Sequence, residues 1–142
     1  MEELQHSGNS RSDSIKVIST PQSLSSISAD ISEARPTGII EFDRVLNGGL
    51  TPGSVTLLGG EPGIGKSTLV LQLCKALAIA GQKCCVITGE ESVQQVARRA
   101  ERLRVRSENI LLLAESDMET ILATIVEHST DFVVIDSVQT MN

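Results

Sequence analysis

Apolar residues follow two alternating periods along most of the chain. Short, continuously apolar runs indicate buried strands. These runs are residues 83–88, 109–113 and 132–136. Longer segments with apolar residues at helical spacing indicate helices. These segments are residues 67–80, 90–103 and 117–128. Strands that alternate with helices predict an α/β fold with a parallel sheet and right-handed crossovers.

A further strand and a short helix are expected ahead of this pattern. Residues 54–59 are an apolar run between a Pro52-Gly53 turn and a glycine-rich loop, and they are expected to form a short buried strand. Upstream of that turn, Thr37 is expected to cap a short apolar helix that ends at residues 47–49, Asn-Gly-Gly.

The ends of the longer helices carry their own signals. Gly81 follows the segment 67–80 and is expected in the left-handed conformation that closes a helix. Ser116 and Glu119 have the spacing of a capping box at the start of the last helix. One apolar stripe is expected on that helix. It consists of Met118, Ile121, Leu122 and Ile125.

Composition refines this picture. The 142 residues are enough for one domain, and they are 40% hydrophobic but only 1% aromatic, so the core must be aliphatic. Residues 1–34 are mostly polar without a sustained period and are expected to be a disordered arm or linker. Residues 35–142 are then the ordered domain.

Charge, cysteine spacing and the length of apolar runs argue against a strongly basic nucleic-acid binder, a cysteine metal site and a membrane-spanning protein. A formal net charge of -6 argues against gripping nucleic acid by overall charge, although a local basic patch stays open. Cys74, Cys84 and Cys85 lack metal-ligand spacing and are expected to be reduced core thiols. No apolar run approaches the roughly 20 residues of a membrane span, and no signal peptide is recognisable, so the cytoplasm is the expected compartment.

The glycine-rich loop carries the strongest chemical signal. Gly60, Gly65, Lys66 and Ser67 match the spacing of a P-loop, which binds the phosphates of ATP. Glycines let the backbone amides approach the phosphates, the lysine reaches the β- and γ-phosphates, and the hydroxyl ligates Mg²⁺. The expected ATP-binding residues are Gly60, Glu61, Pro62, Gly63, Ile64, Gly65, Lys66, Ser67 and Thr68. Lys66 is also expected to assist catalysis.

Asp136 closes the last apolar strand. An aspartate at this position is often a turn residue. Downstream of a P-loop, however, the pattern is typical of a Walker B segment, whose aspartate orients Mg²⁺. Asp136 is therefore expected, with Ser67, at a magnesium site.

The run Thr88-Gly89-Glu90-Glu91 supports two interpretations. Thr88 and Glu91 fit a capping box, which is a structural role. Glu90 would lie beside the carboxyl end of a strand, where a carboxylate can act as general base on the water that attacks the γ-phosphate.

Arginines gather near the helix at 90–103. They are Arg98, Arg99, Arg102, Arg104 and Arg106. Contact with DNA, phosphate or a neighbouring subunit is one interpretation, and a solvated helix face is the other. His6 and His128 have no partners at ligand spacing and are expected on the surface.

Residues 37–140 resemble the bacterial RadA family of DNA repair proteins, also called Sms. The motifs that carry the resemblance are Thr37-Gly38-Ile39, Gly48-Gly49-Leu50, the P-loop, Thr88-Gly89-Glu90-Glu91-Ser92 and the run Ile135-Asp136-Ser137-Val138-Gln139-Thr140. The resemblance implies a three-layer, RecA-like P-loop core with a mostly parallel sheet. It also implies a ring-forming, DNA-dependent ATPase that processes recombination intermediates in DNA repair, with Glu90 as the catalytic glutamate.

The sequence departs from the family at both ends. The family's four-cysteine zinc finger, its Lys-Asn-Arg-Phe-Gly motif and its Lon-like domain are not among the 142 residues, so zinc is not expected. RecA-like sheets also place a later strand between the P-loop strand and the Walker B strand. The sequence therefore predicts a truncated core, incomplete at its C-terminus, with an empty strand position and marginal stability.

Two alternatives to the DNA-dependent ATPase stay open. One is a fragment that binds nucleotide or other subunits without turnover. The other is a small-molecule kinase built on the same P-loop, for which no lid or acceptor site is recognisable in the sequence.

Overall fold

The computed structural model of the chain describes residues 20–27 and 33–142. By its contacts the chain divides into two units, Met1–Ile31 and Ser32–Asn142. Within the described part of the first unit, a 3-10 helix, η1, spans Leu24–Ser26 and has no buried residue. The expected disordered arm at residues 1–34 lies largely outside the described residues, and His6 lies outside them as well.

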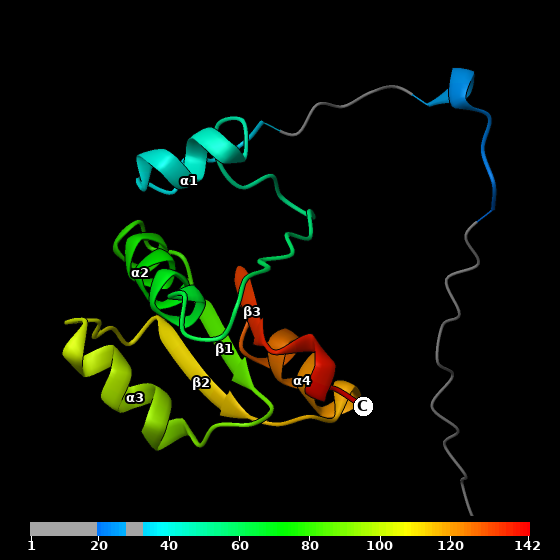
Figure 1. Cartoon of the computed structure of the whole chain (residues 1–142). Coiled ribbons are helices and arrows are strands. Elements are labelled where there is room, and N and C mark those ends of the chain that lie inside the picture. Colours follow the sequence, from blue (N-terminus) through cyan, green and yellow to red (C-terminus); the bar gives the residue numbers. More distant parts are fainter. Residues whose placement is uncertain (1–19, 28–32) are drawn as a thin grey trace, which may run out of the picture. The chain divides into compact units, whose positions relative to one another are not determined.

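The second unit is built around a three-stranded parallel sheet (Figure 1). Its strands are β1 (Cys84–Thr88), β2 (Ile110–Ala114) and β3 (Phe132–Asp136). The order across the sheet is β2-β1-β3, and Thr88 pairs with Ala114 on one side and Asp136 on the other. The carboxyl ends of all three strands therefore lie level at one edge, which is where parallel α/β sheets place their binding residues.

Four helices accompany the sheet. They are α1 (Ile40–Val45), α2 (Lys66–Ile79), α3 (Val93–Arg102) and α4 (Met118–Glu127). The expected helices and their order are confirmed, with ends that differ by one to three residues. In the described ranges no helix is long and apolar enough to cross a bilayer.

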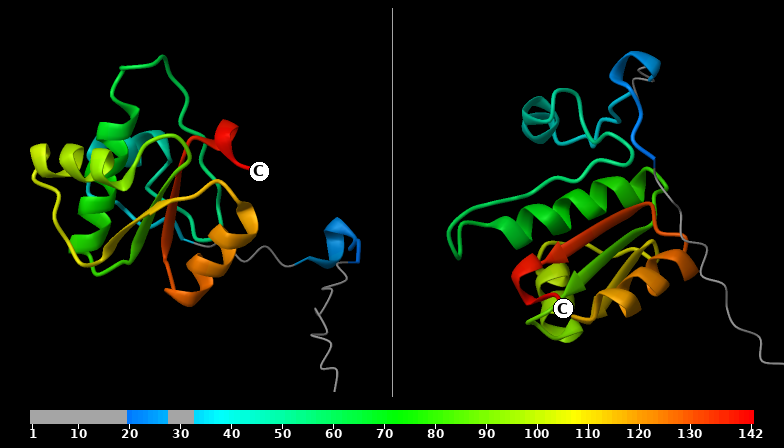
Figure 2. Two further views of the ribbon diagram at one scale, coloured as in Figure 1. Left: turned by 90° about the horizontal axis from the view of Figure 1, so that it is seen from below. Right: turned by 90° about the vertical axis from the view of Figure 1, so that its right-hand side faces the viewer.

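Helices cover both faces of the sheet, as Figure 2 shows in its right-hand view. Successive side chains of a strand point to opposite faces, and β1 follows this rule. Cys84 and Val86 pack in one core cluster with residues of α2 and α3, whereas Cys85 and Ile87 pack with Ile121 of α4. The expected α/β class with a parallel sheet is confirmed, and both clusters consist of aliphatic residues and cysteine.

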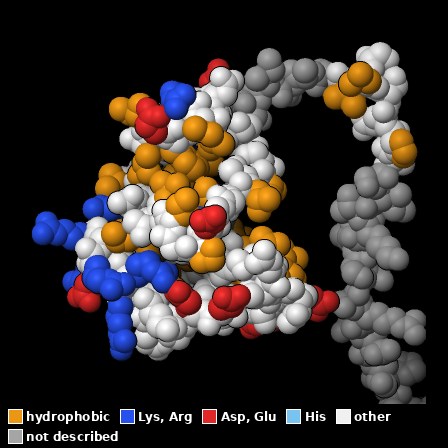
Figure 3. Space-filling view, viewed as in Figure 1, with side chains coloured by type: hydrophobic (Ala, Val, Ile, Leu, Met, Phe, Trp, Pro, Cys, Tyr) orange, Lys and Arg blue, Asp and Glu red, His pale blue; other side chains and the backbone are white. Residues whose placement is uncertain are grey.

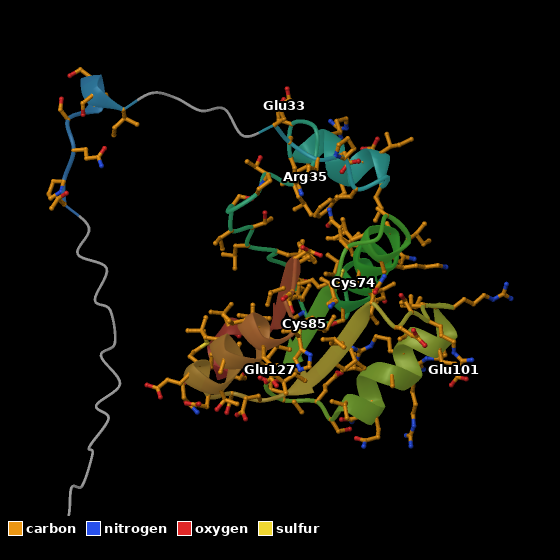
Figure 4. All side chains as sticks on the ribbon, turned by 180° about the vertical axis from the view of Figure 1, so that it is seen from behind. Glu33, Arg35, Cys74, Cys85, Glu101 and Glu127 are labelled. Atoms are coloured by element: carbon orange, nitrogen blue, oxygen red, sulfur yellow. The ribbon has the colours of Figure 1, made fainter. Side chains whose placement is uncertain are left out.

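The three cysteines lie inside these clusters. Cys74 of α2 and Cys85 of β1 are labelled in Figure 4, and all three thiols are buried and free. Burial raises the pKa of Cys85, because a thiolate is poorly solvated away from water. The expectation of reduced core thiols is confirmed.

The expected strand at residues 54–59 is wrong. The segment has no regular structure, and Val55 and Leu57 are 96% and 85% exposed. A strand is stable only when a neighbour accepts and donates its backbone hydrogen bonds. In the described part of the chain no strand pairs with this segment, and β3 is left as an edge strand of the sheet. The apolar run therefore stays exposed.

The expected cap of α1 is also wrong. The residue before the helix is Ile39, which makes no side-chain cap. The Thr37 hydroxyl accepts from the Ile39 backbone N–H at 3.2 Å, ahead of the helix, and donates to the Asp43 carboxylate. The Asp43 carboxylate accepts hydrogen bonds from the backbone N–H groups of Thr37 and Gly38. These bonds lower the pKa of Asp43 although desolvation acts in the opposite direction. The segment before α1 is therefore bonded to the helix through Asp43, a residue inside the helix.

Neither predicted capping box starts its helix, although the Thr88 hydroxyl does accept from the Glu91 backbone N–H at 2.9 Å. Helix α3 begins at Val93 behind Ser92, whose hydroxyl accepts from the Gln95 backbone in a complete capping box. At α4 the cap is Asp117, which accepts from the Thr120 backbone at 2.9 Å. Ser92 caps α3 in place of Thr88, and Asp117 caps α4 in place of Ser116. Each helix therefore begins later in the chain than expected.

The predicted apolar stripe on α4 is partly confirmed. Ile121 is buried, and Met118 and Ile125 pack partly buried against its cluster, as the stripe predicted. The prediction is wrong for Leu122, because 56% of this side chain's surface is exposed. The α4 surface also holds His128, which is exposed as expected.

Candidate functional site

The glycine-rich loop leads directly into α2. Gly65 is the residue before the helix and has φ 109°, a left-handed conformation that side-chain-bearing residues rarely adopt. The first backbone N–H groups of this 14-residue helix then point toward the loop. An anion held there would meet both free amide donors and the positive end of the helix dipole.

Lys66 folds back over the loop. Its Nζ donates hydrogen bonds to the carbonyl oxygens of Gly60 at 2.6 Å and Glu61 at 2.9 Å. An ammonium group has three donors, so these two bonds fix its position and leave one donor for a ligand. A Cβ at Gly60 would make a tight 3.0 Å contact with Ile64 Cγ2 and an ordinary 3.7 Å contact with Lys66 Cδ.

Ser67 reaches the end of β3. Its Oγ donates to the Asp136 carboxylate at 2.9 Å, across 69 residues of sequence. The P-loop therefore lies against the carboxyl end of the sheet, and the two predicted metal-site residues are brought together. Hydroxyl and carboxylate oxygens are the ligand types that Mg²⁺ prefers.

A magnesium ion would need further ligands at this place. In residues 20–27 and 33–142, no three His, Cys, Asp or Glu side chains gather as a metal cluster. Mg²⁺ typically takes one or two protein ligands and completes its shell with waters and substrate phosphates. Ser67 and Asp136 beside an anion-binding loop fit that pattern.

Glu90 lies one strand away from Asp136. It follows β1 by two residues, and the backbone N–H of Gly89 donates to the Asp136 carbonyl at 3.2 Å. The Glu90 side chain is exposed, and in the described ranges no hydrogen bond or ion pair engages it. It lines an open pocket of about 370 Å³ at the ends of β1 and β2.

Glu91 has different surroundings. Its backbone N–H donates to Thr88 Oγ1 at 2.9 Å, and its carboxylate accepts from Arg99 Nη2 at 2.6 Å. That hydrogen bond, with the negative charges of Glu91 and Asp136, raises the pKa of Arg99. The sequence offered no signal for this pair, because it depends on where α3 begins.

The segment after β3 folds over the same edge. The 3-10 helix η2 (Val138–Thr140) places Thr140 where a Cβ on Gly89 would have to lie. Asn142 continues the cover by exchanging backbone hydrogen bonds with Ser116 and Met118, at 2.8 and 3.2 Å. The contact between Thr140 and Gly89 is a second one that motif spacing could not predict.

A basic surface follows α3 and its end. The exposed arginines are Arg98, Arg102, Arg104 and Arg106. Figure 3 shows Lys and Arg side chains gathered on this part of the unit, with acidic side chains beside them. Both interpretations of this surface stay open, whereas Arg99 is set apart by its bond to Glu91.

Comparison with protein families supports the nucleotide-binding interpretation. A family model described as "ATPase: KaiC" matches residues 35–112. The match covers α1, the P-loop, α2, β1, α3 and the start of β2.

Several curated relatives carry the name "DNA repair protein RadA". The protein of Bacillus subtilis is 42% identical over 130 residues, which are 92% of this chain and 28% of that protein. That of Mycobacterium tuberculosis is 43% identical over 137 residues, 95% of this chain and 28% of its own length. For Listeria monocytogenes the identity is 45% over 118 residues, 83% of this chain and 26% of the relative. The chain thus spans about a quarter of the length of these relatives.

Proposed function

The chain belongs to the KaiC-type ATPase family and is similar to the DNA repair protein RadA, and on this premise we propose that it binds ATP with Mg²⁺ and hydrolyses the bond between the β- and γ-phosphates, releasing ADP and phosphate. The contact between Ser67 and Asp136 carries this proposal. It joins the P-loop to the Walker B strand, so one ligand could meet the loop amides and the metal-site oxygens together.

The loop and Lys66 would hold the phosphates. Amide donors at the start of α2 favour an anion, and the Lys66 ammonium already lies over the loop through its bonds to Gly60 and Glu61. Its remaining donor would bind a phosphate oxygen and stabilise the charge that develops in the transition state. Lys66 therefore serves both binding and catalysis.

Ser67 and Asp136 would hold Mg²⁺ beside these phosphates. The bound ion neutralises phosphate charge and aligns the transferring group. The Ser67 hydroxyl now donates to Asp136, so on metal binding it would turn its oxygen lone pair to the ion. Asp136 would then keep Ser67 oriented, directly or through a metal-bound water.

Glu90 would act as the general base. Its carboxylate is exposed at the carboxyl end of β1, next to the strand that ends in Asp136. A carboxylate in this position can accept a proton from the attacking water while the P-loop holds the γ-phosphate.

The biological setting follows from similarity to RadA. We propose a DNA repair ATPase of the cytoplasm that acts on DNA and recombination intermediates and assembles as a ring. The basic surface on α3 is one candidate for contact with DNA or a neighbouring subunit. A small-molecule kinase would need an acceptor site, and none is recognisable in the sequence. A fragment that only binds nucleotide would have no use for a general base such as the exposed Glu90.

ATP hydrolysis in the presence and absence of single-stranded DNA tests the proposal. DNA-stimulated release of phosphate is the expected result. Phosphorylation of a small acceptor would contradict it in favour of a kinase. Saturable ATP binding without phosphate release would contradict it in favour of a non-catalytic fragment.

A further inference from the structure

Two adjacent glutamates follow β1, and the structure treats them differently. Glu91 is held at both its backbone and its carboxylate, by Thr88 and by Arg99. Glu90 is exposed, and within residues 20–27 and 33–142 its side chain has no hydrogen-bond or ion-pair partner. Sequence alone cannot separate two identical neighbouring side chains, but these contacts can.

The arginine that holds Glu91 comes from a firmly packed helix. Arg99 lies in the last turn of α3, eight residues after Glu91. The start of α3 is fixed by the Ser92–Gln95 capping box, and its middle is fixed by Val96, which is buried in the core cluster. Arg99 therefore extends from a helix whose position is fixed by packing and capping.

The contact is also more sheltered than the other described ion pair. The side chains of Arg99 and Glu91 are 25% and 38% exposed, whereas Arg44 and Glu41 are 71% and 77% exposed. Exposed ion pairs contribute little stability, but a half-buried, charge-assisted hydrogen bond can fix an orientation. A change at Arg99 should then affect geometry more than folding.

We propose that Arg99 is a positioning residue: by holding Glu91, it sets the conformation of the loop after β1 so that Glu90, and not Glu91, presents its carboxylate as the general base. This inference rests on the proposed hydrolysis of ATP. The loop is fixed at its other side by the Gly89 N–H, which bonds to the Asp136 carbonyl. Glu90 is thus the one side chain of the pair that can turn toward a nucleotide.

Steady-state ATP hydrolysis by the full chain tests the inference. Arg99→Ala should lower kcat roughly 10- to 100-fold through misplacement of the base, with KM nearly unchanged. Arg99→Lys should recover part of the rate, since it restores the charge but not the fork of donors. The matched control is Gln94→Ala, at an exposed position of the same helix outside the basic surface, which should keep the wild-type rate.

A double substitution separates positioning from chemistry. Glu91→Gln combined with Arg99→Ala should be no slower than the slower single variant, because both changes break one contact. Additive losses would overturn the inference. So would a loss in Glu91→Gln that equals the loss in Glu90→Gln while Arg99→Ala stays active, since Glu91 would then be the base.

A measurement without turnover keeps the two proposals distinguishable. The side-chain ¹⁵N signal of Arg99 should shift in Glu91→Gln and stay in place in Glu90→Gln. Equal shifts in both variants would overturn the assignment of contacts. The expected shift together with no hydrolysis by the unsubstituted chain would refute the proposed ATPase and, with it, the role of Arg99.

Discussion

The hydroxyl of Ser67 donates a hydrogen bond to the carboxylate of Asp136 at 2.9 Å. One residue belongs to the first turn of α2 and the other ends β3. The bond joins a loop that favours anions to a carboxylate that favours cations, and this combination is what a magnesium-bound triphosphate requires.

Ser67→Ala should weaken binding of ATP only when Mg²⁺ is present. The variant loses the hydroxyl ligand but keeps the loop amides and Lys66. Loss of this one ligand is expected to cost about 1.4 kcal/mol, or roughly tenfold in Kd. Calorimetric titrations with and without Mg²⁺ measure it, and Ser67→Thr is the control that should retain affinity. Equal weakening without the metal would place Ser67 outside the magnesium site.

Glu90→Gln should abolish turnover and preserve binding. Glutamine keeps the size of the side chain but cannot accept the proton of the attacking water. Loss of a general base typically costs about 10²- to 10⁴-fold in rate. Phosphate release at saturating ATP measures kcat, and a titration confirms that Kd is unchanged. A variant with normal kcat would remove Glu90 from the mechanism.

Gly89→Ala should destabilise the fold. An added Cβ would collide with the side chain of Thr140 and lie 3.0 Å from Met141 Cε. Overpacking of this kind costs about 1 to 3 kcal/mol. Urea unfolding followed by circular dichroism measures the loss of unfolding free energy.

Two further variants control the test at Gly89. Gly59→Ala should be tolerated, because a Cβ at Gly59 meets no atom within 4 Å. Thr140→Gly should restore part of the stability of Gly89→Ala by removing the collision. Failure of this rescue would mean that η2 does not pack on the Gly89 loop in solution.

Acid should remove a contribution of Asp43 to stability. Its pKa is lowered in the folded chain, since the bonds from Thr37 and Gly38 outweigh desolvation. The contribution is present above the unfolded pKa of about 4 and is lost as pH falls through the lower folded value. Asp43→Asn should therefore show a smaller drop in urea midpoint between pH 7 and pH 3 than the unsubstituted chain. Glu41→Gln, at an exposed ion pair, is the control that should keep the full drop.

The sequence predicted the elements that rest on local pattern. The run 132–136 became β3 with the expected bounds, and the end of α2 before Gly81, which has φ 84°, followed from its left-handed preference. Contact between Ser67 and Asp136 followed from motif spacing once both were placed at the carboxyl edge of a parallel sheet. These features depend on hydrophobic period and on backbone rules.

The remainder depends on partners that a local pattern does not contain. Residues 54–59 have the composition of a strand, yet Val55 is 96% exposed because no described strand pairs with the segment. The bond between Glu91 and Arg99 depended on whether α3 starts at Glu90 or behind Ser92, and several capping residues competed for that start. Competition between adjacent caps is decided by packing, which the sequence does not display.

Binding of Mg²⁺-ATP to the chain and to Lys66→Ala, measured by isothermal titration calorimetry, tests the central claim most directly. The Lys66 ammonium lies on the Gly60 and Glu61 carbonyls, so its removal should take away the phosphate contact without disturbing the core. The expected result is saturable binding by the unsubstituted chain, with affinity reduced at least about tenfold in the variant. Circular dichroism spectra of the two proteins should coincide. A folded chain that binds no ATP, or that binds it equally well without Lys66, would contradict the assignment of this loop as a nucleotide site.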